Sequence, residues 1–181
     1  PDHPDLATTY GNIGLVYSKM GRYSESLSNH EKALEILRKS LPLDHPDLAT
    51  TYGNIGLVYS DMGRYSESLS NYEKALEIEQ KSLPPDHPDL ATTYGNIGLV
   101  YCHMGRYSES LSNHEKALEI LQKSFPPDHP NLATIHNNIG LVYSDMGRYS
   151  ESLSNYEKAL EILQKSLPPD HPDLATTYGN I

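Results

Sequence analysis

The chain has 181 residues and a formal net charge of −10, which results from 24 acidic and 14 basic residues. Non-specific nucleic-acid binding needs clustered Lys and Arg, and a membrane span needs about 20 apolar residues in a row. Neither pattern is present, so we expect no nucleic acid and no membrane among the partners. Cys102 is the single cysteine and has no internal disulfide partner, which favours a reducing compartment, and we expect a cytoplasmic protein.

Apolar residues near the start of the chain follow helical periodicity. They recur at spacings of three and four, which places them on one face of a helix: Leu6, Tyr10, Ile13, Tyr17 and Met20. Pro4 is tolerated in a first turn, and Gly21 is a plausible helix stop. The first element is therefore expected to be an amphipathic helix that ends at about Met20.

A second helical pattern follows directly after Gly21 in the sequence. Its apolar positions are Tyr23, Leu27, Ala33, Leu34, Leu37 and Leu41. The segment from Leu41 to Pro46 then contains two prolines, which fix φ and lack an amide donor, so the helix must end there. We expect a helix, a tight glycine turn, a longer helix and a proline-bearing loop, with no strands.

This pair of predicted helices recurs with a period of 42 residues. The first two units differ at only five positions, which are Lys19/Asp61, His30/Tyr72, Leu37/Glu79, Arg38/Gln80 and Leu43/Pro85. Self-similarity at a fixed period indicates a solenoid, in which each unit buries its apolar face by stacking on a neighbour. We expect a single array over residues 1–181, with repeats at 3–44, 45–86, 87–128 and 129–170 and a partial fifth repeat at 171–181.

Two small residues per unit are expected to let the paired helices approach closely. Gly14 lies inside a helix, where glycine costs about 1 kcal/mol relative to alanine, yet it recurs in every full unit. A glycine kept at an unfavourable place suggests a close approach of the helix backbones. Ala33 and its equivalents are expected to serve the same purpose from the second helix.

The spacing of Ile13, Gly14, Tyr17, Gly21, Tyr23 and Ala33 resembles the tetratricopeptide repeat (TPR). The usual TPR period is 34, and the longer period here, together with Asn-Ile-Gly-Leu-Val-Tyr and Pro-Asp-His-Pro, is similar to the kinesin light chain type. Ser26 stands where the family usually has alanine. The resemblance implies an all-α, right-handed α-solenoid, or superhelix, of stacked antiparallel helix pairs that acts as a protein-binding scaffold.

The resemblance also implies that the first helix of each pair lines a concave groove. The face opposite the apolar stripe carries Asn12 and Leu15, where a leucine would be out of place on a purely solvated surface. Asn can hold a peptide backbone with two donors and an acceptor, and Leu offers apolar area. Alternatively, Leu15 packs on the next unit and Asn12 satisfies local backbone. The candidate peptide-binding residues are Asn12, Leu15, Asn54, Leu57, Asn96, Leu99, Asn137, Asn138 and Leu141.

The same face limits the ligand. TPR grooves that take acidic peptides use Lys and Arg, whereas the corresponding place here varies as Lys19, Asp61, His103 and Asp145. We therefore expect neutral or basic peptides rather than acidic ones. Asn137 replaces a glycine found in the other units, so the fourth unit could differ in preference. The near-identical pockets suit a ligand that itself repeats, or a mechanical role.

Metal binding and catalysis find little support. Five of the nine histidines share one loop position before a proline. Because stacked helices lie about 8–10 Å apart, these equivalent histidines are too far apart to share an ion held at about 2.0 Å. His30 and His114 alternate with Tyr72 and Tyr156, which indicates packing or partial exposure rather than ligation. Cys102 replaces a serine of the other units and is interpreted as a neutral exchange. We expect no cofactor, no metal, no catalytic residue and no enzyme activity.

Two further readings of the array remain open. Leu174, Tyr178 and Ile181 lack the second helix that should cover them, so separate molecules could stack end to end into a rod or spacer. A weaker alternative is a sensor array attached to a further domain. The leading interpretation is a protein–protein interaction scaffold that binds an extended peptide in its groove.

Overall fold

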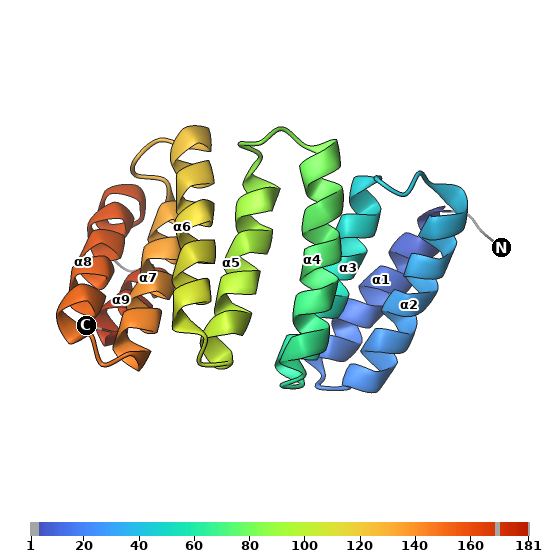
Figure 1. Cartoon of the computed structure of the whole chain (residues 1–181), viewed down its shortest axis with the longest axis horizontal. Helices are drawn as coiled ribbons and strands as arrows, with labels where there is room; N and C mark the ends of the chain where they lie inside the picture. The colour runs from blue at the N-terminus through green and yellow to red at the C-terminus, as the bar shows by residue number, and fades with distance from the viewer. Residues whose placement is uncertain (1–3, 169–170, 181) are drawn as a thin grey trace. The chain divides into compact units, whose positions relative to one another are not determined.

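The computed structural model describes residues 4–168 and 171–180; His3, Asp170 and Ile181, which the sequence assigned to repeats, lie outside these ranges. The described residues form nine α-helices and no strands. Figure 1 shows these helices in chain order. The helices are α1 (Pro4–Lys19), α2 (Tyr23–Ser40), α3 (Pro46–Asp61), α4 (Tyr65–Ser82), α5 (Pro88–His103), α6 (Tyr107–Ser124), α7 (Pro130–Asp145), α8 (Tyr149–Ser166) and α9 (Pro172–Asn180). The all-α prediction is confirmed, and every predicted helix pair is present.

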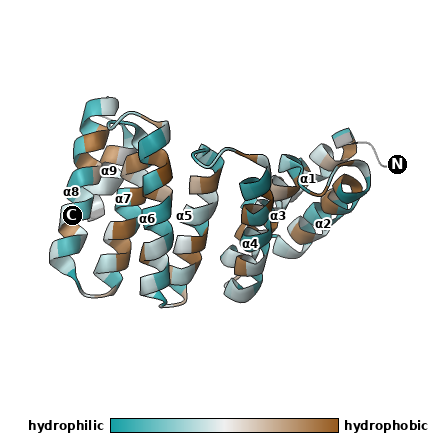
Figure 2. Cartoon of the chain, turned by 45° about the horizontal axis from the view of Figure 1, so that its top comes forward, coloured by the Kyte–Doolittle hydropathy of each residue, from teal (hydrophilic) through white to brown (hydrophobic). Residues whose placement is uncertain are grey.

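The chain divides into two compact units, Pro1–Pro85 and Asp86–Ile181. Within each unit, a short first helix packs against the longer second helix of its own repeat, and that second helix packs against the first helix of the next repeat. Figure 2 shows hydrophobic and hydrophilic bands along the same helices, as expected of helices that bury one face. Each unit is therefore a stack of antiparallel helix pairs.

The loop histidines begin the first helices of the second, third and fourth repeats. Nδ1 of His45, His87 and His129 accepts a hydrogen bond of 3.2 Å from the backbone N–H two residues later. The following proline occupies the first helical position, where its missing N–H costs nothing. These histidines are N-caps, which explains why a residue that sequence reasoning assigned only to a loop recurs in each unit.

The turn within each pair is a Schellman motif, shown here for the second repeat. Gly63 has a φ of +72°, and its N–H donates to the carbonyl of Ser60 at 2.9 Å. The N–H of Arg64 donates to the carbonyl of Tyr59 at 2.8 Å, which completes the motif. Glycine is required at this left-handed position, and the prediction of a glycine helix stop is confirmed.

The turn arginine ties the two helices together at the same corner. In the first repeat, the Arg22 guanidinium lies 4.6 Å from the centre of the Tyr17 ring and donates to Glu25 at 2.6 and 2.8 Å. The hydrogen bonds from Arg22 hold the pKa of the Glu25 carboxyl below its usual value. The same arrangement recurs in the other three full repeats. In each full repeat, this arginine therefore links the end of the first helix to the start of the second.

The core of each unit lies between successive pairs. In the first unit, Ala7, Ala33, Ile36, Leu37 and Leu48 form one cluster, so α1, α2 and α3 meet there. In the second unit, the cluster of Ala91, Ala117, Leu121, Leu132, Ile135 and Ile139 joins α5, α6 and α7 in the same way. The predicted apolar positions of both helices contribute, and each cluster spans two repeats as solenoid stacking requires.

The ends of the helix stacks differ from expectation in two ways. On α1, Leu6 and Ile13 are 38% and 40% exposed, whereas their equivalents on α3, Leu48 and Ile55, are 1% and 4% exposed. The stripe of α3 is buried because the preceding helix pair packs against it. Leu174 was expected to be uncovered, but it is 4% exposed and packs with Ala133, Ala159 and Leu163 because the preceding repeat covers it. Tyr178 is 56% exposed.

The glycine inside each first helix does mark a close approach, but the neighbour is an aromatic ring and not a backbone. A Cβ atom at Gly14 would lie 2.8 Å from the His30 ring, and one at Gly56 would lie 3.1 Å from the Tyr72 ring. The Ser26 hydroxyl donates to the carbonyl of Gly14 at 2.8 Å, and this buried bond recurs in every full repeat. The serine that departs from the family pattern thus gains a hydrogen bond while remaining small.

Candidate functional site

The predicted Asn and Leu residues lie on one face of the first helices. Asn and Leu are three positions apart in each repeat, so they are neighbours on the helix surface. Leu15, Leu57 and Leu141 are 37%, 45% and 39% exposed, and Leu99 is half-buried. These leucines are therefore available to a ligand, and complete burial of Leu15 against the next repeat is ruled out.

The first unit contains a cavity of about 270 Å³ between α1 and α3. The predicted residues Asn12, Leu15 and Asn54 line it. The remaining wall contains Leu37 of α2, with Asp47, Thr50 and Thr51 from the start of α3 among the other lining residues. We call this space the first cavity. Its position between consecutive first helices is the one that the resemblance implied for a groove.

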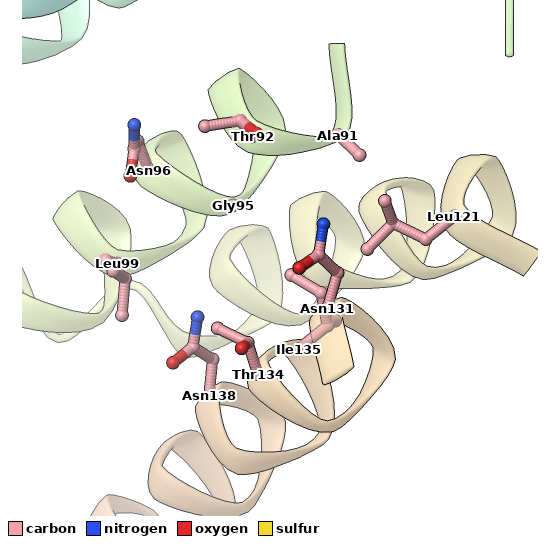
Figure 3. Close-up of a pocket in the computed structure, with 10 residues that line it drawn as sticks. All are labelled: Ala91, Thr92, Gly95, Asn96, Leu99, Leu121, Asn131, Thr134, Ile135 and Asn138. Atoms are coloured by element: carbon pink, nitrogen blue, oxygen red, sulfur yellow. The ribbon is translucent and has the colours of Figure 1, made fainter. Parts of the chain in front are cut away.

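The second unit contains the equivalent cavity, of about 300 Å³, between α5 and α7. The predicted residues Asn96, Leu99 and Asn138 line it, together with Leu121 of α6. Figure 3 shows Leu99 and Asn138 extending toward each other from α5 and α7. We call this space the second cavity. All ten of its lining residues stand at the repeat positions that line the first cavity, each 84 residues further along the chain.

A third cavity, of about 380 Å³, is lined by residues of α7, α8 and α9. The predicted residues Asn137, Asn138 and Leu141 line it. Asn137 Nδ2 donates to Thr177 Oγ1 at 3.2 Å, while its Oδ1 atom is buried without a hydrogen-bond partner. Asn137 therefore fastens α7 to α9 with one end of its amide and leaves an acceptor at the other.

Eight of the nine predicted residues line these three cavities, and Leu57 does not. The residues of variable charge, Lys19, Asp61, His103 and Asp145, line none of the three. Among the residues that the structure describes, no basic residue lines them either, and Asp47 in the first cavity is the one ionised group in their lining. The local chemistry is thus amide, hydroxyl and alkyl, with a single carboxylate.

The predicted site residues did not include the N-terminal turns of α3 and α7, which line the cavities. Thr50 and Thr134 lie one helical turn before Asn54 and Asn138, and Asp47 and Asn131 lie two turns before them. That spacing alone would have placed them on the same face. The contribution of Leu37 and Leu121 from the second helices could not be found this way, because it depends on how the pairs stack.

The two buried histidines are packing residues. His30 and His114 are both 0% exposed, and neither ring nitrogen of either residue has a hydrogen-bond partner. Burial lowers the pKa of His30 and lowers the pKa of His114 to about 4. Among residues 4–168 and 171–180, no group of three or more His, Cys, Asp or Glu side chains could hold a metal ion.

Cys102 is buried, and its thiol is uncharged at neutral pH. Burial and the neighbouring Asp145 carboxylate raise its pKa to about 12, and its Sγ donates to Asp145 Oδ2 at 3.4 Å. A nucleophile needs a thiolate, which this environment disfavours. In the part of the chain that the structure describes, no helix has the length and apolarity needed to cross a membrane.

The chain belongs to the tetratricopeptide repeat family. Family models described as tetratricopeptide repeat match residues 6–47, 47–123, 89–165 and 131–181. Repeats of this family generally mediate protein–protein interactions, and proteins built on them are typically non-enzymatic scaffolds. A comparison with curated protein sequences found no match.

Solved structures with the same fold include kinesin light chain-like TPR proteins. BtubC (BKLC) from P. vanneervenii has a TM-score of 0.80 and 23% identity, over 93% of this chain and 68% of that chain. A candidate kinesin light chain of Podosopora anserina with nearly identical TPR-like repeats has a TM-score of 0.79 and 22% identity, over 98% and 88%. The apo form of RapI has a TM-score of 0.77 and 22% identity, over 97% and 46%. The TM-scores show a shared fold.

Proposed function

We propose that this chain is an interaction scaffold that binds an extended peptide along the face formed by its first helices. One observation carries the proposal: cavities in both units are lined by the same ten repeat positions, which include the Asn and Leu residues singled out from sequence. Amide groups bind peptide backbone, and the neighbouring leucines offer apolar area to side chains. Such repeated sites suit a ligand whose residues recur at a matching spacing.

The peptide is proposed to be neutral or basic. No Lys or Arg lines the three cavities, so an acidic side chain would lose water without gaining an opposite charge. The formal net charge of −10 adds a long-range repulsion for anionic ligands. A cytoplasmic location agrees with the one cysteine being a buried free thiol.

The test is a screen of a synthetic peptide library against the wild type and the Asn54→Ala/Asn96→Ala variant. Binding should fall for the variant while the helical circular dichroism signal stays unchanged. The matched control is Asn71→Ala/Asn113→Ala, because these asparagines lie on second helices and donate to the carbonyls of Glu67 and Glu109 at 2.8 Å. Equal binding by the wild type and the Asn54→Ala/Asn96→Ala variant would contradict the proposal.

Self-assembly is a second candidate function, based on another surface. Ile13 and Val16 on α1 are 40% and 57% exposed, whereas the equivalent Ile55 and Val58 on α3 are 4% and 1% exposed and pack with Leu27. A helix pair of the same kind, from a second copy or a longer chain, would cover this surface. Light scattering over a wide concentration range tests the first case, and an invariant monomer mass would exclude it.

A further inference from the structure

The first and second cavities share all ten repeat positions but differ in two residues. Asp47 and Thr51 in the first cavity are replaced by Asn131 and Ile135 in the second. The other eight pairs are identical in residue type. The chain therefore contains a natural comparison of two pockets in which one charge and one hydroxyl have been exchanged.

The exchange of Asp47 for Asn131 changes charge with almost no change in shape. Asp47 is the one ionised group that lines the first cavity, and its side chain is 60% exposed. His45 Nδ1 lies 3.7 Å from its carboxylate, but that nitrogen also accepts the N-cap bond from the Asp47 N–H and can do so only while unprotonated. The carboxylate is thus free to attract a cationic ligand group, at an exposed site where ion pairs are modest.

The exchange of Thr51 for Ile135 changes the polarity of the cavity lining. Thr51 Oγ1 donates to its own helix, at 2.8 Å from the carbonyl of Asp47. Ile135 instead reaches toward α5, where its Cδ1 atom lies 3.5 Å from the position of a Cβ at Gly95. At Gly11, the equivalent glycine, no atom lies within 4 Å of that position. The second cavity therefore has an extra alkyl group beside α5 at this point, although its volume of about 300 Å³ is not smaller than the 270 Å³ of the first.

From these differences we infer that the first cavity selects a Lys or Arg side chain and the second selects an uncharged, apolar side chain. The two units would then prefer different side chains of a bound peptide, although their sequences are nearly the same. This inference rests on the proposed function for its biological meaning. The preference of each cavity can be measured without any peptide.

The experiment is disulfide tethering at equivalent positions. Thr50 and Thr134 are exposed, line the first and second cavities respectively, and occupy the same repeat position. Thr50→Cys and Thr134→Cys are made separately in a Cys102→Ser background, because serine stands at that position in the other repeats. Each protein is equilibrated with cystamine and dipropyl disulfide in competition under 2-mercaptoethanol. Mass spectrometry then gives the ratio of aminoethyl to propyl adduct, two groups of nearly equal size that differ in charge.

The ratio of aminoethyl to propyl adduct is expected to be about two- to fivefold higher at position 50 than at position 134, the range typical of an exposed ion pair. The general attraction of an acidic protein for cations acts at both positions and cancels in this comparison. Asp47→Asn should remove the excess at position 50, and Asn131→Asp should raise the ratio at position 134. Equal ratios at the two positions, or ratios that ignore both exchanges, would overturn the inference.

A second pair of attachment points is a control for local effects of the introduced cysteine. Thr8 and Thr92 line the same two cavities from α1 and α5, and they also share a repeat position. The same ordering of ratios is expected there, and a reversed ordering would count against the inference. The outcome is independent of the peptide screen: loss of the proposed function with intact ratios would leave two selective cavities that serve another ligand.

Discussion

The His114 ring lies so close to Gly98 that a Cβ atom at the glycine would come within 2.7 Å of ring atom Cε1. Real Cβ atoms do not approach this closely, so the ring occupies the space that an alanine methyl group would need. The Ser110 hydroxyl, one helical turn before His114, donates to the carbonyl of the same glycine at 2.7 Å. One residue of α5 therefore anchors α6 through both packing and a hydrogen bond.

Gly98→Ala is expected to destabilise the protein by about 1–3 kcal/mol, the usual cost of overpacking a core. Alanine favours the helix by about 1 kcal/mol over glycine, so any net loss must come from the ring contact. Chemical denaturation monitored by circular dichroism measures the free energy of unfolding. Gly53→Ala is the control, because no atom lies within 4 Å of its Cβ position, and it should leave stability unchanged or raise it. Two equally stable variants would refute the packing argument.

Ser110→Ala should lower the free energy of unfolding by about 1 kcal/mol, because it removes a buried hydrogen bond to the carbonyl of Gly98. The fold should survive, since alanine is the residue that the family usually has here. Ser112→Ala is the matched control on the same helix, where the side chain is exposed. A loss at Ser112 as large as that at Ser110 would show that the hydrogen bond is not the cause.

Stability should fall as the pH is lowered from about 6.5 to about 4, the range set by His114. Burial lowers the folded-state pKa of His114 from 6.5 to about 4, so the unfolded chain binds the proton first and acid favours unfolding. The loss from this residue is about 2 kcal/mol at pH 5. His30, whose pKa is also lowered by burial, acts in the same direction.

The chain itself supplies the control for this pH dependence. Tyr72 and Tyr156 occupy the same repeat position as the histidines and stay neutral in acid, so the His30→Tyr/His114→Tyr variant should lose much of the slope between pH 6.5 and 4. Denaturation curves at half-unit pH intervals give the measurement. A variant with the full wild-type slope would contradict the assignment of the effect to His30 and His114.

Cys102 should resist thiol reagents in the native protein. A pKa of about 12 leaves few thiolates at pH 8, and the side chain is buried, so we expect labelling by dithionitrobenzoate to be slower than in the unfolded chain by about two orders of magnitude or more. The rate is followed by absorbance with and without guanidinium chloride. Fast labelling under native conditions would mean that α5 opens readily or that the thiol is more accessible than its surroundings indicate.

Much of the fold could be predicted because its determinants are local. The spacing of Leu6, Tyr10 and Ile13 predicts a helix. Gly21 and Pro42 each end a helix through their own backbone geometry. The 42-residue period then predicts stacking. The contact of Gly14 with His30 could not be identified, because the sequence shows a glycine kept at a costly position but not which side chain fills the space.

The candidate site was predicted in part for the same reason. Asn12 and Leu15 lie on one face of one helix, so helix geometry was enough to select them and their equivalents. The contribution of Leu37 depends on packing between helix pairs, which a helical wheel does not contain. The exchange of Thr51 for Ile135 is visible in the sequence, but the contact of the Ile135 side chain with α5 at Gly95 becomes clear only from the structure.

The central claim is that a peptide lies on the face formed by the first helices, and site-specific photo-cross-linking tests it most directly. A photo-reactive group on the peptide would label repeats whose proteolytic fragments are nearly identical, so the labelled repeat could not be assigned. p-Benzoylphenylalanine is therefore placed in the protein, either at Leu57 on α3 or at Ser70 on α4, both of which are exposed. Irradiation with a labelled peptide from the library is expected to give a covalent adduct at position 57 and none at position 70. An adduct at position 70 with none at position 57 would contradict the claim.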